Sequence, residues 1–274
     1  MKIVHSFVTP LRLQAMFQCQ WSVVSDRWST LIGSPCLPVS RLLSLVSRLL
    51  SPVSSLRYPR LMCGRYILKA LKADVIKHFN LIDGLDYFDI HGYKMRDEVF
   101  PGEWITSINN TNRPEDIWWT IEDKDNSGAP RRAINAKAET LSKVQMFANA
   151  FRTDRVLIPA TGFFEWDCSK QRHLFTFDEP LFAFGGIARD CEIKGETRRC
   201  GVVITTVAND VVKPIHEKGR MPVVIHKYDY KRWLDPETPF DELRRMTAPL
   251  TNEETHVEKA DEPEKQDSAQ GSLF

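Results

Sequence analysis

The chain has 274 residues, of which 42% are hydrophobic and 10% aromatic, and its formal net charge is +1. This content allows a sizeable core, but the balanced charge does not indicate nucleic acid, which would have to be bound by a local patch. No apolar run approaches the roughly 20 residues that span a bilayer, so we expect a soluble protein with no membrane partner.

Residues 1–61 differ in kind from the rest. They hold seven Lys/Arg against a single acid, Asp26, and from Val39 they contain a near-repeat, VSRLLSL and VSRLLSP. Three interpretations stay open: a targeting segment, a propeptide, or upstream sequence translated from a start codon placed too early. We favour the last because Met62 is a ready alternative start. A disordered extension, not a domain, is expected here.

From Met62 to Leu250 the pattern indicates one domain. Apolar spacing predicts a helix over residues 69–80, and a second is expected over 139–151. Closing helical turns are expected at 229–233 and 240–246. Segments rich in β-branched and aromatic residues predict strands at 116–121, 155–158, 162–166, 174–177, 181–187, 201–206 and 221–225. Because strands and helices do not alternate regularly, we expect an α+β fold with a curved, barrel-like, mainly antiparallel sheet and flanking helices.

The last segment, residues 251–274, holds seven acids against Lys259 and Lys265 and lacks periodic apolar positions, which predicts a disordered acidic tail. Its end resembles the short peptides by which bacterial proteins dock on the replicative sliding clamp, with Gln270, Leu273 and Phe274 as the contacts. An arbitrary C-terminus is the alternative.

The six cysteines form no C-x-x-C pair and have no neighbouring histidine at zinc spacing. The sequence therefore predicts no metal site, no cofactor and no disulfide framework. A reducing, cytoplasmic compartment fits best.

Cys63 follows Met62 directly. If Met62 is removed, Cys63 presents a free α-amine and a thiol on one carbon skeleton. The amine condenses with an aldehyde to an imine, and the thiol then closes onto the imine carbon to give a five-membered thiazolidine. An internal cysteine cannot do this. Because an α-amine titrates at about pH 7.7–8.0, a useful fraction is the free nucleophile at neutral pH.

Two further residues are candidates for proton transfer. Glu165 lies among apolar neighbours, and desolvation would raise the pKa of such a carboxyl into the range of a general acid or base. The alternative is a strand whose Glu165 points to solvent. His216 lies in a loop before the strand at 221–225 and can exchange a proton near neutral pH, although a loop histidine is more often ordinary.

Other polar and aromatic positions have two interpretations each. Asn135 is either a site residue or a helix N-cap. Arg220 can bind a phosphate through two parallel hydrogen bonds. Trp118 and Trp119 are adjacent in a strand and face opposite sides, so at least one is a candidate surface for a nucleobase to stack on.

The combination of these motifs resembles a known family. Met-Cys-Gly-Arg at 62–65, Asn-Ala-Lys-Ala-Glu-Thr at 135–140, Ile-Pro-Ala-Thr-Gly-Phe-Phe-Glu-Trp at 158–166 and the His...Arg-Met-Pro element at 216–222 occur in the order seen in the SOS response-associated peptidase (SRAP) family. The resemblance spans roughly Met62 to Leu250. It implies a bacterial DNA-damage protein that senses abasic sites in single-stranded DNA, loses its initiator Met by self-cleavage, and crosslinks covalently to the ring-opened sugar.

The resemblance also implies roles for individual residues. Cys63 would be the nucleophile, Asn135 would orient the cysteine and the sugar, Glu165 would be the acid/base, and His216 would promote ring opening and imine chemistry. The implied DNA contacts are Arg65, Lys137 and Arg220 to phosphates, and Pro101, Trp118 and Trp119 to bases.

Three departures from the family pattern matter. Three residues separate His216 from Arg220, where many members have one. Lys137 stands where arginine is common, which turns a bidentate phosphate contact into a point charge. With residues 1–61 attached, Cys63 has no free amine.

Two other classes of function stay open. One is a peptidase that acts on other proteins with Cys63 as an internal thiolate. The other is a non-covalent reader of single-stranded or modified DNA, which would need the aromatic and basic residues but not the thiol. A monomer at replication forks is expected for the crosslinking protein.

Overall fold

The computed structural model describes residues 63–124, 127–193 and 195–261, which all belong to the chain unit Arg60–Phe274. The expectations for residues 1–61 and for the clamp-docking residues Gln270, Leu273 and Phe274 lie outside these ranges. Within the described ranges, no helix has the length and apolar character needed to cross a membrane.

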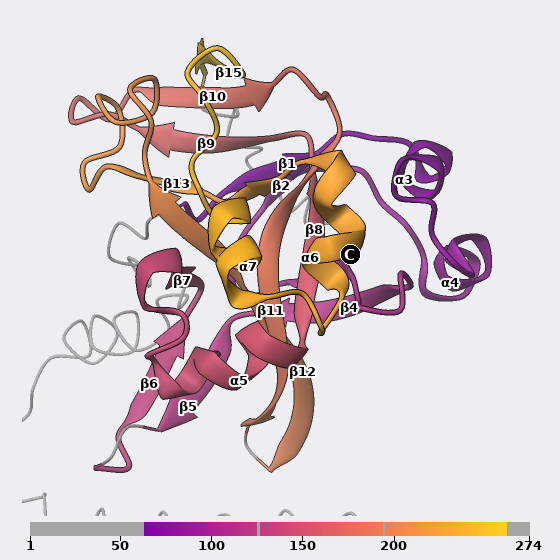
Figure 1. The fold of residues 1–274 in the computed structure, drawn as a ribbon. Coiled ribbons are helices and arrows are strands. Elements are labelled where there is room, and N and C mark those ends of the chain that lie inside the picture. Colours follow the sequence, from indigo (N-terminus) through magenta and orange to yellow (C-terminus); the bar gives the residue numbers. More distant parts are fainter. Residues whose placement is uncertain (1–62, 125–126, 194, 262–274) are drawn as a thin grey trace, which may run out of the picture. The chain divides into compact units, whose positions relative to one another are not determined.

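Five strands close into a barrel, which confirms the predicted α+β fold with a barrel-like sheet (Figure 1). Each strand pairs with the next around the ring, and every pairing is antiparallel except β12 with β4. In ring order the strands are β12 (Glu196–Val207), β4 (Pro114–Trp119), β3 (Trp104–Ile108), β8 (Arg155–Ala160) and β11 (Phe182–Ile193). β8 is buried at all six positions, as expected for a strand covered on both faces.

A second, fully antiparallel sheet has the order β15-β10-β9-β1-β2. The strand predicted at 162–166 is β9, which has the same bounds and lies in the middle of this sheet. In Figure 1, β9, β10 and β15 lie above the barrel. The members are β15 (Thr255–Ala260), β10 (Arg172–Phe177), β9 (Gly162–Trp166), β1 (Tyr66–Leu68) and β2 (Arg96–Val99).

Shorter strands complete the sheets. β7 (Asn135–Lys137) runs parallel to β12, and β13 (Arg220–Pro222) and β14 (Val224–Ile225) pair with β12 and β11. β5 (Ile121–Lys124) and β6 (Pro130–Ala133) form a separate two-stranded sheet. The predicted strand at 221–225 is therefore two short strands.

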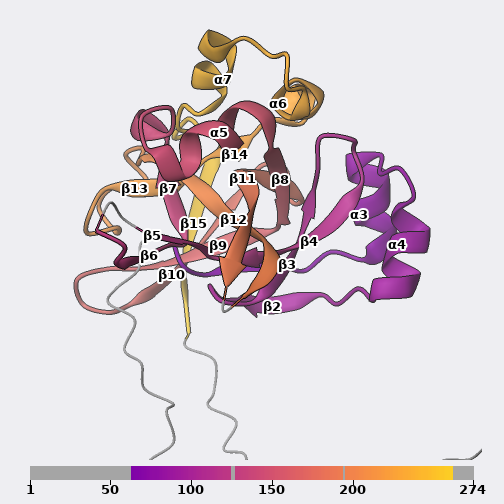
Figure 2. The same cartoon turned by 90° about the horizontal axis from the view of Figure 1, so that it is seen from below.

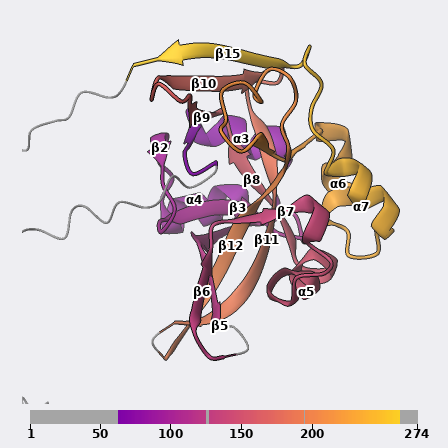
Figure 3. The ribbon, with the colours of Figure 1, turned by 90° about the vertical axis from the view of Figure 1, so that its left-hand side faces the viewer.

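Three helices lie together on one side of the barrel (Figures 2 and 3): α5 (Gln145–Thr153), α6 (Tyr230–Leu234) and α7 (Phe240–Met246). α5 places Met146, Phe147, Ala150 and Phe151 in the core, which is an apolar stripe at helical spacing. The buried Arg155 of β8 joins α5 and α6 to the barrel, since its guanidinium donates to the carbonyls of Phe151 and Trp233 at 2.6 Å each.

The predicted helix over 69–80 is confirmed as α3 (Lys72–Phe79), which is followed by α4 (Gly84–His91). The predicted helix over 139–151 is divided. A 3-10 turn, η1 (Ala138–Thr140), is separated from α5 by tight turns around the fully buried Leu141. The chain turns at Leu141 so that this side chain enters the core. Tertiary packing therefore interrupts the single helix that the sequence pattern predicts. The turns expected at 229–233 and 240–246 are η2 (Lys227–Asp229) with α6, and α7.

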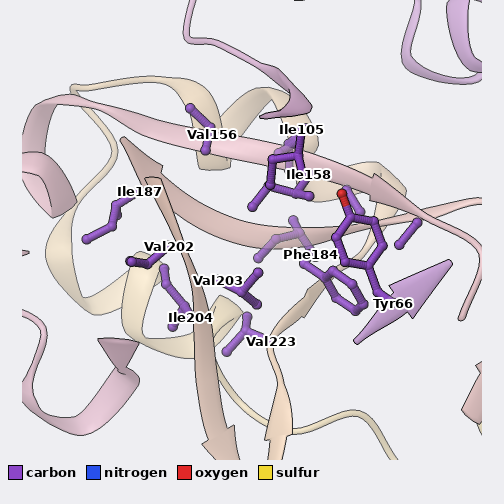
Figure 4. Packing of buried hydrophobic residues seen from close by; sticks show 14 of the residues in the cluster. Tyr66, Ile105, Val156, Ile158, Phe184, Ile187, Val202, Val203, Ile204 and Val223 are labelled. Carbon is purple, nitrogen blue, oxygen red and sulfur yellow. The ribbon is translucent and has the colours of Figure 1, made fainter. Parts of the chain in front are cut away.

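The core lies inside the barrel and between the two sheets. Figure 4 shows β-branched side chains of β8, β11 and β12 packed together, with Tyr66 of β1 against Phe184. The rings of Tyr66 and Phe184 meet edge to face, with centroids 5.8 Å apart. Tyr66 therefore anchors the second sheet to the barrel.

Trp119 belongs to this core, and its predicted role as a base-stacking surface is wrong. It is 1% exposed, its ring centroid lies 5.3 Å from that of Tyr66, and its indole N–H donates to the Ile134 carbonyl at 2.9 Å. Trp118 faces the opposite side of β4 and is partly exposed. Of the two, only Trp118 is accessible to a base.

The predicted disordered tail is also wrong for its first part. Thr255–Ala260 forms β15, which pairs with β10 from Arg172↔Ala260 to Phe177↔Thr255. Four of its six residues are exposed, because an edge strand is held by backbone hydrogen bonds and needs no apolar periodicity. The domain therefore extends beyond Leu250.

We expect the chain to lose stability when it ends after Leu250 but not when it ends after Asp261. Without β15, β10 becomes an edge strand with a row of unpaired backbone groups, which favours aggregation. Thermal unfolding followed by circular dichroism, together with light scattering, measures both effects. Equal melting temperatures and equal scattering for the two chains would contradict the structural role of β15.

Trp119→Ala should destabilise the fold by about 3–5 kcal/mol, because it leaves a large cavity in the core. Trp118→Ala is the matched control and should cost much less, since this ring is partly exposed. Urea unfolding of both variants measures the difference. Similar losses would show that Trp119 is not the core residue described here.

Candidate active site

Four residues far apart in the sequence meet at one place. Cys63 precedes β1, Glu165 lies on β9, His216 lies in the turn before β13, and Asn135 lies on β7. Donor atoms of the Cys63, Glu165 and His216 side chains all lie within 4.8 Å of one another, and all three residues are buried. The structure thus brings together the four residues expected to be catalytic.

Strand pairing positions Cys63 beside Glu165. β1 pairs with β9 through Tyr66↔Phe163, so the residues that precede β1 run alongside the end of β9. Alternation along β9 puts Phe163 and Glu165 on the same face, and Phe163 is in the core. Cys63 has φ 46°, a left-handed conformation that L residues rarely adopt. Its backbone nitrogen donates to Glu165 Oε1 at 2.8 Å.

Glu165 is buried, as its apolar neighbours predicted, and does not point to solvent. Burial raises its pKa to about 8, although hydrogen bonds from the Cys63 thiol and backbone N–H oppose the rise. Burial, and then the nearby carboxylate, raise the pKa of the Cys63 thiol well above its ordinary value. At neutral pH both groups therefore hold their protons when Cys63 nitrogen is a peptide nitrogen.

His216 faces the same carboxylate. Its Nε2 lies 3.6 Å from Glu165 Oε1, and its Nδ1 accepts hydrogen bonds from the backbone N–H groups of Lys218 at 3.0 Å and Arg220 at 3.4 Å. Because Nδ1 is an acceptor, the proton of the neutral imidazole is assigned to Nε2, toward Glu165. Burial lowers the pKa of His216, which favours this neutral form.

The three residues between His216 and Arg220 form a turn that accommodates the longer spacing. Gly219 has φ 57°, a conformation that suits glycine, and its N–H donates to the His216 carbonyl at 2.8 Å. The turn leaves His216 directed into the site and Arg220 at the start of β13.

Asn135 lies beside Cys63 and does not cap a helix. It lies on β7, paired with Val203 of β12, and its side-chain nitrogen is 3.5 Å from the Cys63 carbonyl oxygen. The following 3-10 turn begins at Ala138, with Lys137 at its cap position. Asn135 thus contacts the peptide group between Cys63 and Gly64.

Arg220 is less available to a phosphate than the sequence suggested. It is 8% exposed, and its guanidinium binds both oxygens of Glu139, at 2.6 and 3.0 Å, and the Thr205 carbonyl at 2.6 Å. The Glu139 side chain is 47% exposed. A phosphate could reach the Arg220 fork only by displacing Glu139.

Arg65 and Lys137 remain partly or fully exposed near the site. The Arg65 guanidinium lies over the rings of Phe100, at 4.1 Å, and Trp166, at 5.3 Å, and forms an ion pair with Glu98 at 3.1 Å. These contacts hold the side chain of Arg65, which is two residues after Cys63, in one position.

The turn that contains Pro101 lies beside the end of β4, where Trp118 is located. Pro101 is in the turn between β2 and β3, and the N–H of the next residue, Gly102, donates to the Trp119 carbonyl at 3.0 Å. Trp118 meets Trp104 edge to face at 5.6 Å between centroids, and Trp104 is 48% exposed.

Two further groups were missed by sequence reasoning. Trp104 could have been found as an aromatic residue on the strand before Trp118. Arg172 could not, because its partners come from other strands: its guanidinium lies 3.5 Å from the ring centre of Phe164 and forms an ion pair with Glu98, which also binds Arg65.

The chain is similar to known proteins over most of its length. The SOS response associated peptidase (SRAP) family model matches residues 62–262. Abasic site processing protein YoqW of Bacillus subtilis is 31% identical over 202 residues, covering 69% of this chain and 87% of that protein. Abasic site processing protein YoaM of the same organism is 29% identical over 201 residues, with 69% and 86% covered.

Solved structures share the fold. A protein from Bacteroides thetaiotaomicron aligns with a TM-score of 0.64 at 21% identity, covering 72% of this chain and 91% of that one. A phage-related protein from Bordetella bronchiseptica aligns with a TM-score of 0.58 at 20% identity, with 73% and 95% covered. From the family match and the similarity to YoqW it follows that the chain belongs to the SRAP family.

Proposed function

We propose that the chain, once it begins at Cys63, captures abasic sites in single-stranded DNA as a covalent thiazolidine. The contact between Cys63 nitrogen and Glu165 Oε1, at 2.8 Å, carries this proposal. That nitrogen is a peptide nitrogen in the full chain and would be the reactive amine after loss of Met62. The names of the similar Bacillus proteins support abasic DNA as the target.

Glu165 is suited to help release Met62. In hydrolysis of the Met62–Cys63 bond, water adds to the Met62 carbonyl carbon and the departing Cys63 nitrogen takes up a proton. A carboxyl with a pKa of about 8 holds that proton at neutral pH, and it already contacts the nitrogen. The family match begins at residue 62, which agrees with a working chain that starts at this point.

The same groups can drive capture. The amine adds to the open-chain sugar aldehyde, and the resulting carbinolamine loses water to give an imine. The thiol then adds across the C=N bond, its sulfur joining carbon while its proton passes through Glu165 to nitrogen. His216 Nε2 faces Glu165 and can supply or accept a proton for ring opening and water loss.

DNA binding is proposed for the exposed residues around this centre. Arg65 and Lys137 would contact phosphates, and Trp118 with Pro101 would contact bases. Docking of Gln270, Leu273 and Phe274 on the sliding clamp, and with it a place at replication forks in the SOS response, is a further proposal that lies outside the described residues. Deleting Leu273 and Phe274 and measuring clamp binding tests it.

The raised pKa of the Cys63 thiol weighs against an ordinary peptidase acting on other proteins. An internal cysteine nucleophile needs a lowered pKa to react as thiolate, and burial beside Glu165 has the opposite effect. A non-covalent reader of DNA would bind the same oligonucleotide without forming an adduct, and the first test below distinguishes it from the crosslinking protein.

The first test compares a chain that begins at Cys63 with the full 274-residue chain. Each is incubated with a single-stranded oligonucleotide carrying one abasic site and analysed by denaturing gel and intact mass. We expect a denaturation-resistant adduct only where Cys63 is the first residue. Cys63→Ser keeps the amine, so its adduct should survive only after borohydride reduction of the imine. Cys168→Ala, an exposed cysteine, is the control. An adduct formed by a chain that retains residues before Cys63 would contradict the proposal.

The second test concerns the acid/base. In a chain that begins at Met62, Glu165→Gln should slow loss of Met62 by about 100-fold or more, because the amide cannot deliver the proton. Asp167→Asn, which changes an acid just past the end of β9 that contacts His173, should process normally. Mass spectrometry of the N-terminus over time measures both rates. Equal rates for Glu165→Gln and the unaltered chain would remove Glu165 from this role.

A further inference from the structure

One carboxylate serves both nucleophilic atoms of Cys63. Glu165 accepts a hydrogen bond from the Cys63 nitrogen at 2.8 Å and another from its thiol, and His216 Nε2 lies 3.6 Å from the same oxygen. Loss of a proton from the amine, protonation of the leaving water and transfer of the thiol proton can therefore all begin or end on one group. None of these steps needs a contact with DNA.

The side chains proposed to hold DNA are bound to groups other than Glu165 and His216. The Arg65 guanidinium is paired with Glu98 and lies over Phe100. Trp118 packs on Trp104. The groups that would transfer protons and the side chains that would bind DNA thus contact different partners, so the chemistry proposed for Cys63 requires an aldehyde but not a nucleotide.

We propose that free small aldehydes are a second class of substrate for this site, and that they cap Cys63 as a thiazolidine and so block capture of DNA. This inference rests on the proposed function, because it requires the free amine of Cys63. With formaldehyde, the amine and the carbonyl lose one water to form an imine, and the thiol adds to the imine carbon. The net change is the gain of one carbon atom by Cys63, and no oxidant or reductant takes part.

The folded site should accelerate this reaction relative to an unfolded peptide with the same N-terminus. A short peptide beginning Cys-Gly-Arg has the same two nucleophiles but lacks Glu165 and His216. Positioned general acid–base groups contribute about 10²–10⁴-fold each. We therefore expect the folded chain to form the adduct at least about 100-fold faster than the peptide, and Glu165→Gln to lose most of this advantage.

The experiment uses the chain that begins at Cys63, dilute formaldehyde, and the peptide Cys-Gly-Arg-Tyr-Ile-Leu as reference. Peptide mapping by mass spectrometry locates the adduct and gives its rate, and the capped chain is then offered the abasic oligonucleotide. Both reactions are repeated at raised salt, which weakens binding to DNA phosphates but should leave formaldehyde capture unchanged. Cys63→Ser, which cannot close the ring, should form no stable adduct at its first residue.

We expect an adduct confined to Cys63, faster than in the peptide, insensitive to salt, and incapable of DNA crosslinking. If the chain crosslinks DNA but reacts with formaldehyde no faster than the peptide, the inference is wrong while the proposed function stands. If the uncapped chain crosslinks no DNA either, the proposed function itself is wrong.

Discussion

The hydrogen bond between Cys63 nitrogen and Glu165 is the interaction on which the site depends. It joins residues 102 positions apart, and it exists because β1 and β9 are neighbours in the second sheet. Burying a carboxyl is unfavourable unless it is protonated or bonded, and here the cost is offset by donors from Cys63. That same burial raises the pKa of Glu165 and makes the group useful for proton transfer.

The barrel gives this contact its rigidity. Tyr66, three residues after Cys63, packs on both Trp119 and Phe184. Aromatic packing in the core thus fixes β1, the strand that places Cys63 beside Glu165. In the barrel sheet, β12 supports β7 and β13, which position Asn135 and the turn that holds His216. Two sheets thus contribute residues to one candidate site.

Sequence reasoning succeeded where local chemistry decides the outcome. The apolar neighbours of Glu165 indicated burial and a raised pKa, and the α+β barrel followed from short strands without regular alternation with helices. It failed where distant partners decide. Nothing local shows that Trp119 rather than Trp118 enters the core, that Leu141 interrupts a helical pattern, or that the charged segment 255–260 pairs with β10. That Cys63, Glu165 and His216 lie together could be predicted only from the resemblance to a family, because no spacing in the sequence indicates it.

The ion pair between Arg220 and Glu139 has a consequence for how damaged and intact strands are told apart. A phosphate that reaches Arg220 exchanges one anion for another, so little electrostatic free energy is gained. The Arg65–Glu98 pair sets the same condition for a phosphate that approaches Arg65. Intact strands, which offer only phosphates and bases, would then be held briefly and released. Under the proposed function, discrimination would then come from the aldehyde of the ring-opened sugar, which intact strands lack, and not from tight binding.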